Sequence, residues 1–355
     1  MATASSPDRA DRAVRAWLWV VWGMILTMVV VGGITRLTGS GLSMVEWRPL
    51  MGALPPLSEA EWIAVFEQYK QSPQYQQVNH WMTLGDFERI FFWEYFHRLL
   101  GRLIGVVVLV PGLWFLARRR LRGKRAVQVL LAFVFGGLQG LLGWYMVKSG
   151  LVDVPAVSHY RLAAHLSLAF FVGCWILWIL LGLRAPTART GRPGVVRGGL
   201  AFLGLLTVQI VWGAFMAGTR AGYLYRTWPD MNGEYWPTGA GLSLAELTHN
   251  PLSIHAVHRH LALVVVALGV WLGVRALKAA TDGGQRRVAR LFLLALFAQL
   301  GLGIATVMAA MPTAIASAHQ GMAFLLLCAN IAILHAFSNS SEKAAQPVGL
   351  GPPSQ

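Results

Sequence analysis

Eight long runs of apolar residues are separated by segments rich in polar residues. The runs cover residues 16–36, 87–117, 126–147, 156–183, 199–218, 252–277, 290–310 and 313–337. A membrane span needs about 20 consecutive apolar residues, and inside lipid only helices and closed barrels satisfy all backbone hydrogen bonds. The runs lack the alternation of a lipid-facing barrel strand. The pattern therefore predicts an all-α polytopic membrane protein with eight transmembrane helices.

The composition supports this prediction, and the charge adds an orientation. Hydrophobic residues make up 55% of the chain and charged residues 13%, which excludes an ordinary soluble domain. The net charge of +15 would also suit a nucleic-acid-binding protein. However, the basic residues cluster before the first span and in every second loop, at 9–15, 118–125, 184–197 and 278–290. This is the positive-inside pattern, so we expect both termini in the cytoplasm, a lipid membrane around the helices and no nucleic-acid partner.

Two further features bear on the compartment. The segment before the first span contains Asp8 and Asp11 and does not resemble an acid-poor transit peptide. We therefore expect a bacterial plasma (inner) membrane. The two cysteines, Cys174 and Cys328, fall inside predicted spans, which indicates neither an external disulfide nor a CxxC metal site.

The sequence contains one four-helix unit twice. The outer loops 37–86 and 219–251 are long and the other loops are short, and this spacing repeats after four spans. Three motifs repeat with it: Glu94-Tyr95-Phe96-His97-Arg98 with His255-Ala256-Val257-His258-Arg259, Gln139-Gly140-Leu141-Leu142-Gly143 with Gln299-Leu300-Gly301-Leu302-Gly303, and Ala164-His165 with Ala318-His319. Because four spans separate the counterparts, each runs in the same direction. The repeat predicts two pseudo-symmetric four-helix bundles related by an axis along the membrane normal.

The domain boundaries follow from this repeat. We expect a cytoplasmic arm at 1–15, a first half at 16–183, a cytoplasmic linker at 184–198, a second half at 199–337 and a disordered tail at 338–355.

Four histidines occupy equivalent places in the two halves: His97, His165, His258 and His319. Each lies near the outer end of an even-numbered span, so each half presents two imidazoles at a similar depth. The alternative is a set of hydrogen-bonded core histidines, but ionisable groups at such depth are costly and usually functional. Two imidazoles on facing helices suit the iron of a flat macrocycle held between them. Without an acidic or cysteine cluster beside them, a zinc or di-iron site is less favoured.

The remaining histidines have weaker claims. His159 and His260 have no counterpart in the other half, and His80, His249 and His335 lie in a loop or near a span end, so all five are interpreted as interfacial or structural. His255 stands at the place of Glu94, where it packs or hydrogen-bonds near a second porphyrin.

Glu94 breaks the symmetry of the halves. It lies one turn before His97, so the two side chains share a helix face. One interpretation is a salt bridge to Arg98 or Arg102; the other is a group that handles protons or stabilises positive charge at a reacting carbon. Since only the first half has this carboxylate, we assign the chemistry to the first half and a resident cofactor to the second. Arg98 and Arg259 are candidates either for heme propionates or for structural contacts.

At these motifs the chain resembles the heme A synthase family. The resemblance rests on several stretches: Gly32-Gly33-Ile34-Thr35-Arg36-Leu37-Thr38-Gly39-Ser40-Gly41-Leu42-Ser43, Glu94-Tyr95-Phe96-His97-Arg98, Tyr160-Arg161-Leu162-Ala163-Ala164-His165, Ala217-Gly218-Thr219-Arg220-Ala221-Gly222, Thr227-Trp228-Pro229-Asp230-Met231-Asn232-Gly233, His258-Arg259 and His319-Gln320. It covers about residues 16–337. Loop 37–86 contains no cysteine, so the chain resembles the branch without the outer-loop cysteine pair, which includes alphaproteobacterial and mitochondrial forms.

The resemblance implies a reaction and a set of roles. Heme O is oxidised at its C8 methyl group, through an alcohol, to the formyl group of heme A, with water as the oxygen source and an external electron acceptor. His258 and His319 would ligate a resident heme b, His97 and His165 would flank the substrate heme, and Glu94 would be the catalytic carboxylate. The heme sites would face the periplasmic side.

Two other functions fit the paired histidines: a di-heme b-type membrane electron carrier, and a heme transporter or chaperone. Glu94 in one half only, together with the loop motifs, favours the enzyme. Heme O is the expected small partner. Heme O synthase, an electron acceptor, oxidase assembly factors and a second copy of the chain are candidate partners.

Overall fold

The computed structural model describes residues 7–46, 54–151, 155–183 and 191–338, and most of them are helical. Within these described residues, eight helices are long and apolar enough to cross a membrane. They are α1 (Pro7–Leu37), α3 (Leu84–Ala117), α4 (Gly123–Lys148), α5 (His159–Gly182), α6 (Pro193–Thr219), α8 (Pro251–Ala279), α9 (Gly283–Met308) and α10 (Thr313–Phe337). Each coincides with one predicted span. The all-α, eight-span fold class is therefore confirmed.

Capping residues, not the apolar runs, set the helix ends. Helix α6 begins at Pro193, before the predicted 199, because proline suits the first helical position. Helix α9 begins at Gly283, before the predicted 290, where the Asp282 side chain accepts a hydrogen bond from the Gln285 backbone N–H at 2.8 Å. Helix α5 begins only at His159, after the predicted 156.

The predicted arm, linker and tail lie partly outside the described residues. Of the arm 1–15, residues 1–6 are not described, and α1 already begins at Pro7. Of the linker 184–198, residues 184–190 are not described, and 193–198 are part of α6. Of the tail 338–355, only Ser338 is described.

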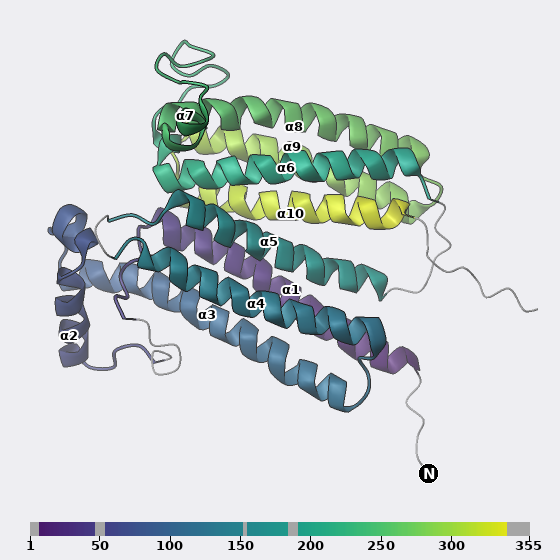
Figure 1. The fold of residues 1–355 in the computed structure, drawn as a ribbon, viewed down its shortest axis with the longest axis horizontal. Helices are drawn as coiled ribbons and strands as arrows, with labels where there is room; N and C mark the ends of the chain where they lie inside the picture. Colours follow the sequence, from purple (N-terminus) through teal and green to yellow (C-terminus); the bar gives the residue numbers. More distant parts are fainter. Residues whose placement is uncertain (1–6, 47–53, 152–154, 184–190, 339–355) are drawn as a thin grey trace, which may run out of the picture.

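The eight long helices form two groups side by side (Figure 1). Helices α1, α3, α4 and α5 contact one another in a ring, and α6, α8, α9 and α10 do the same. The groups meet through contacts of α5 on α6, of α1 on α10 and of α5 on α10. Where α5 and α10 meet, the Sγ atoms of Cys174 and Cys328 lie 4.0 Å apart, and both thiols are buried and free.

Short helices fold the outer loops over one end of the bundles, and the apolar pattern did not predict them. Helix α2 (Glu59–Lys70) and the turn η2 (Tyr75–Asn79) lie beside the start of α3, whereas η3 (Ala221–Tyr223) and α7 (Leu244–His249) lie beside the start of α8. An aromatic cluster fastens α2 to α3: Phe66, Tyr69, Phe87 and Phe91 are buried against one another. Both outer loops therefore cover the same ends of the long helices.

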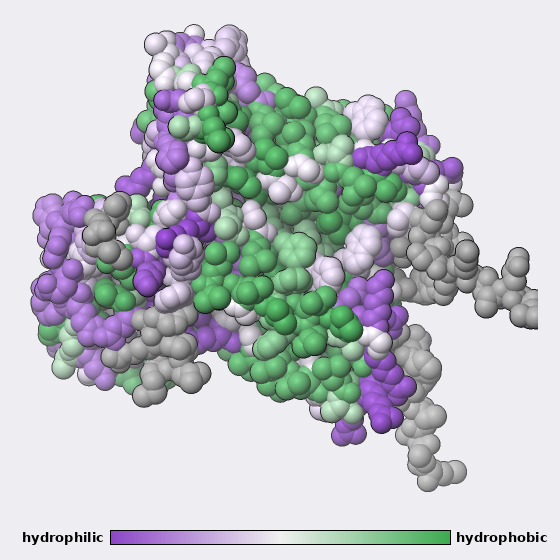
Figure 2. All heavy atoms as spheres, in the orientation of Figure 1, coloured by the Kyte–Doolittle hydropathy of each residue, from purple (hydrophilic) through white to green (hydrophobic). Residues whose placement is uncertain are grey.

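The surface has the character of a membrane protein. Apolar side chains cover the middle of the molecule, between polar ends (Figure 2). On α3 and α4, Val110, Leu130 and Leu141 are 59%, 57% and 59% exposed. Apolar side chains exposed along whole helices of spanning length are typical of a surface that faces lipid. The chain is thus a multi-pass membrane protein.

Candidate functional site

The structure brings the four predicted histidines together as two pairs. His97 of α3 and His165 of α5 are close enough for their charges to interact, and so are His258 of α8 and His319 of α10. All four imidazoles are only half-buried, although helices surround them. Each half therefore has two imidazoles from different helices that keep part of their surface open.

Glycines make room for the two histidines of α5 and α10. A Cβ atom built on Gly143 would lie 2.9 Å from Cε1 of His165, and one built on Gly303 would lie 2.9 Å from Cε1 of His319. Carbon atoms in contact are normally about 3.5–4.0 Å apart. The last glycine of each motif in the predicted repeat, Gln139–Gly143 and Gln299–Gly303, therefore contacts the histidine of the following span.

The other two histidines have the same kind of neighbour. A Cβ atom on Gly213 of α6 would lie 3.1 Å from Cε1 of His258, and one on Gly32 of α1 would lie 3.7 Å from Nε2 of His97. All four imidazoles thus lie against the backbone of an adjacent helix, which fixes where a flat ligand between them would sit.

Glu94 is buried and its carboxylate is held by three donors. The Ser43 hydroxyl and the Met44 backbone N–H donate to Oε2 at 2.7 and 2.8 Å, and Arg98 forms an ion pair with Oε1 at 2.5 Å. The salt bridge that the sequence offered as an alternative is therefore present, with Arg98 as partner. These contacts fix the carboxylate in position at the end of α1, one turn from His97 in α3, with the side chain only 2% exposed.

The two arginines that follow the ligand candidates tie the outer loops to the bundles. Arg98 donates to the carbonyls of Met44 and Glu46 at 3.0 and 3.2 Å. Arg259 donates to the carbonyls of Thr227 and Asp230, both at 2.8 Å. These contacts are the structural role expected as one of two alternatives. The Nη1 atom of Arg259 is buried without a hydrogen-bond partner, so this side chain keeps a donor for an anionic group.

The remaining histidines have structural surroundings. His255 is fully buried, its Nδ1 lies 2.9 Å from the Ala221 carbonyl oxygen, and its Nε2 is buried without a partner. His260 Nδ1 lies 2.8 Å from the carbonyl oxygen of Ala256. His159 packs against Tyr160, Phe215 and His249, and His335 packs against Trp178. His80 is exposed in the outer loop.

Glutamine amides lie against three of the ligand candidates, and sequence reasoning missed their meaning. Gln139 and Gln299 were visible as a repeat without a role. Gln209 of α6 was not singled out, although it lies one turn before the glycine that contacts His258. The spacing between Gln209 and Gly213 was the available signal.

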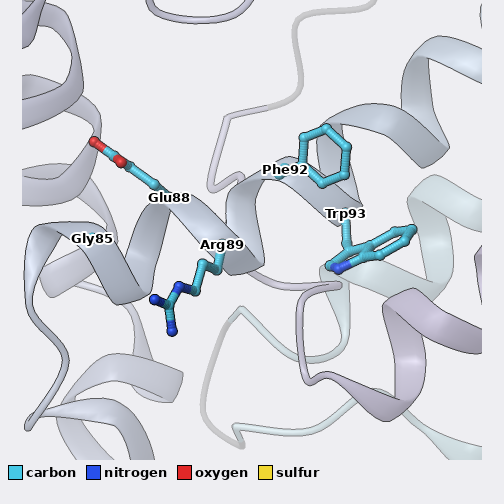
Figure 3. A pocket seen from close by; sticks show the side chains of 5 residues that line it. All are labelled: Gly85, Glu88, Arg89, Phe92 and Trp93. Atoms are coloured by element: carbon cyan, nitrogen blue, oxygen red, sulfur yellow. The ribbon is translucent and has the colours of Figure 1, made fainter.

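In the described part of the chain, two surface pockets lie at the ends of the first-half helices that the long loops cover. One, of about 460 Å³, is lined by Gly85, Glu88, Arg89, Phe92 and Trp93 at the start of α3 (Figure 3). It is open and contains no ligand candidate. A second, of about 220 Å³, lies between α3, α4 and the loop after α1, with Met44, Arg98, Trp144 and Lys148 in its wall. This second pocket adjoins the site, because Arg98 and Met44 also hold Glu94.

The donor set suits a porphyrin. In the described part of the chain, no three His, Cys, Asp or Glu side chains gather around a point where a bare metal ion would bind. A heme iron needs only two protein ligands, since the porphyrin supplies four nitrogens. Paired imidazoles, glycines that leave them room, and the unpartnered Nη1 of Arg259 all fit such a group.

Comparisons with known proteins agree with this interpretation. A family model described as cytochrome oxidase assembly protein, COX15-CtaA, matches residues 15–331. A protein named heme A synthase from Rhodospirillum centenum is 45% identical, over 94% of this chain and 92% of the relative. Proteins of the same name from Rhodopseudomonas palustris and Nitrosospira multiformis are 46% and 40% identical, over 91% and 94% of this chain and 89% and 97% of the relatives.

Proposed function

The chain belongs to the cytochrome oxidase assembly protein family (COX15-CtaA) and functions as a heme A synthase, and we propose that its first half oxidises the C8 methyl group of heme O while its second half retains heme b. The observation that supports assigning oxidation to the first half is the single carboxylate, Glu94, beside the histidine pair of that half. Its counterpart in the second half is His255.

Equivalent contacts support a pseudo-two-fold relation between the halves. Arg98 bonds the carbonyl of Glu46 just as Arg259 bonds that of Thr227, in the loops that follow α1 and α6. Cys174 and Cys328 lie at the same distance along the chain from His165 and His319, and they meet between α5 and α10. Residues at equivalent places meet each other only near a symmetry axis, so we place the axis there.

In the second half, His258 and His319 would ligate the iron of heme b, and Arg259 would offer its free Nη1 to a propionate. Heme iron changes between ferric and ferrous states and so accepts single electrons. The protein's own part is to hold two imidazoles in place and to exclude water from between the helices.

In the first half, His97 and His165 would flank heme O, and Glu94 would act on the reacting methyl carbon. Conversion of the methyl to a formyl group consumes one water and releases four electrons and four protons, and the electrons pass to an external acceptor. A carboxylate held by three donors does not move during the reaction. We therefore assign it the stabilisation of positive charge at the carbon, because fixed charges cost no reorganisation.

Substrate access through the lipid is proposed between α3 and α4. Helices α8 and α9 pack closely, whereas their counterparts α3 and α4 make far fewer contacts. Gly136, Gly137 and Gly140 of α4 face open space. The long apolar tail of heme O would be costly to expose to water, and this gap lets the tail stay in lipid. The pocket beside Arg98 lies at the outer end of the gap.

We place both sites in the outer half of a bacterial plasma membrane, with both termini in the cytoplasm. The basic loops put the first residues of α3, α5, α8 and α10 outside, and the candidate ligands lie in the outer parts of these helices. The outer loops, with α2 and α7, would cover the hemes.

Pigment extraction from the purified full chain tests the proposal. We expect heme b together with heme O or heme A, and we expect His258→Ala or His319→Ala to lose heme b. Two equivalents of heme b and no heme O or A would instead identify an electron carrier. Bound heme O that stays unchanged when an electron acceptor is supplied would identify a transporter.

A further inference from the structure

The pocket beside Glu94 has two cationic side chains in its wall. It has a volume of about 220 Å³ and lies between α3, α4 and the loop after α1. Arg98 of α3 and Lys148 at the end of α4 supply the cations, and Met44 also lines the pocket. Because Arg98 and Met44 hold the Glu94 carboxylate, the pocket adjoins the residue to which we assign the chemistry.

The two cations differ in their partners. Arg98 already forms an ion pair with Glu94. Lys148 is exposed, and its Nζ atom lies over the ring of Trp144, 5.3 Å from the ring centroid. In the described part of the chain, no carboxylate forms an ion pair with Lys148. The charge of Lys148 is therefore available to an anion from outside the chain.

The second half has no counterpart of this lysine. Continued beyond Gly143 and Gly303, the sequence repeat aligns Lys148 with Met308. Met308 is 59% exposed, so packing would not prevent a cation from standing there. The cation at this end of the helix is thus a feature of the first half, as is the carboxylate of Glu94.

The position of Lys148 along α4 places it beyond the level of the histidines. Gly143 of the same helix contacts His165. Lys148 lies five residues further toward the end that the long loops cover, about 7.5 Å along the axis at 1.5 Å per residue. A substituent at the edge of a porphyrin, and not its iron, would therefore lie near this ammonium group.

The chemistry of the substrate indicates which anion would come here. In heme O, the C8 methyl group and one propionate are substituents of the same pyrrole ring, so a methyl group that reaches Glu94 brings a carboxylate close to it. The pocket has the volume of about seven water molecules, which leaves room for a propionate group. Ammonium and guanidinium groups form charge-assisted hydrogen bonds to carboxylates.

We propose that Lys148, with Arg98 beside it, binds the propionate next to the reacting methyl group of heme O and so selects which methyl groups reach Glu94. This inference rests on the proposed function, because it assumes heme O between His97 and His165. The porphyrin of heme O carries four methyl groups, and two of them share a pyrrole ring with a propionate. Binding a propionate in the pocket excludes the other two, and the direction of the apolar tail distinguishes between the remaining pair.

Heme O and its dimethyl ester are matched probes for this contact, because the ester has the same ring and tail without the propionate charges. The full chain is purified with heme b bound, and each probe is titrated into it and followed at the Soret band. We expect the wild type to bind heme O more tightly than the ester. In Lys148→Met, which copies the second half, heme O should bind about two- to fivefold more weakly, as for loss of an exposed charge pair. The ester should bind as it does to the wild type.

Two further variants test whether charge is the cause. Lys148→Glu should weaken the binding of heme O more than Lys148→Met does, because a carboxylate repels the propionate. Lys124→Met removes the other lysine of α4, at the opposite end of the helix, and should leave the affinities for both probes unchanged. Added salt should reduce the preference of the wild type for heme O over the ester, since salt screens exposed charges.

The outcomes distinguish this inference from the function on which it rests. An unchanged preference for heme O over the ester in Lys148→Met would refute the propionate contact and leave the proposed function intact. An equal loss of affinity for both probes would also refute it, because Lys148 would then act only through its packing on Trp144. A wild-type chain that holds heme b but binds neither probe would overturn the proposed function, and this inference with it.

Discussion

Replacing Gly303 by alanine should displace His319 and weaken the binding of heme b. A Cβ atom there would lie 2.9 Å from Cε1 of the imidazole, whereas carbon contacts normally begin near 3.5 Å. The ring, or the whole of α10, must move by about 0.5 Å to relieve this contact. Distances from protein ligands to a metal vary by only about 0.2 Å, so a shift of this size should weaken the bond that His319 would make to the iron.

The cost can be set from overpacking elsewhere. Added methyl groups in well-packed interiors cost about 1–3 kcal/mol, and each 1.4 kcal/mol is a factor of ten in affinity. We therefore expect Gly303→Ala to bind heme b about 5- to 150-fold more weakly. Equilibrium titration of the heme-free protein with hemin, followed at the Soret band, measures this ratio.

A neighbouring glycine of the same helix supplies a matched control. Nothing lies within 4 Å of a Cβ built on Gly301, so alanine there should leave heme b binding unchanged and favour the helix by up to about 1 kcal/mol. Gly143→Ala repeats the 2.9 Å contact in the first half, on His165. It should weaken heme O binding and keep heme b, which also shows that the variant is folded. A Gly303→Ala protein with wild-type heme b affinity and spectrum would refute this account of the site.

Three further predictions follow from the site and the outer loops. Glu94→Gln should abolish heme A production in a strain whose only heme A synthase is this variant, while the protein stays folded with heme b bound. Normal heme A levels would show that the carboxylate has only a structural role, as the partner of Arg98 in the salt bridge. A cysteine at the exposed Gln71 should react with an impermeant thiol reagent added to the periplasmic side, and one at the exposed Lys124 should not; the reverse pattern would invert the topology. Burial raises the pKa of Tyr69 to about 12, and its ordinary value is about 10. The stabilisation of the fold by the neutral Tyr69 hydroxyl is therefore complete below pH 10 and is lost as the pH rises from 10 to 12. Limited proteolysis should accordingly cut the wild-type chain near α2 more readily across that interval. Equal cleavage of wild type and Tyr69→Phe across the interval would contradict this assignment.

Much of the fold was predictable, because a membrane span is a local property of the sequence. About 20 apolar residues in a row are enough to span the lipid, whatever the rest of the chain does. All eight spans were found on this basis. The ends were less accurate, as at Pro193 and Gly283, because helices extend past the apolar run until a capping residue stops them.

The candidate site was partly predictable for a different reason. A repeat gives the same motif twice, so coincidence becomes unlikely at positions such as His97 and His258. The repeat also showed that Glu94 has no acidic counterpart. It did not show which of the two interpretations of Glu94 applied, since the Ser43 and Met44 donors come from a loop far away in the sequence.

The sequence by itself determined the eight helices, the positions of the four histidines along them, and the basic loops from which the orientation of the chain is predicted. Only the tertiary structure decided what each side chain meets: the amide of Gln209 at His258, the backbone of Gly303 at His319, and the loose packing of α3 on α4. Apolar length and charge act on each segment separately. Contacts between helices depend on how each helix is rotated and how closely it approaches its neighbours, and that is set by the packing of the whole bundle.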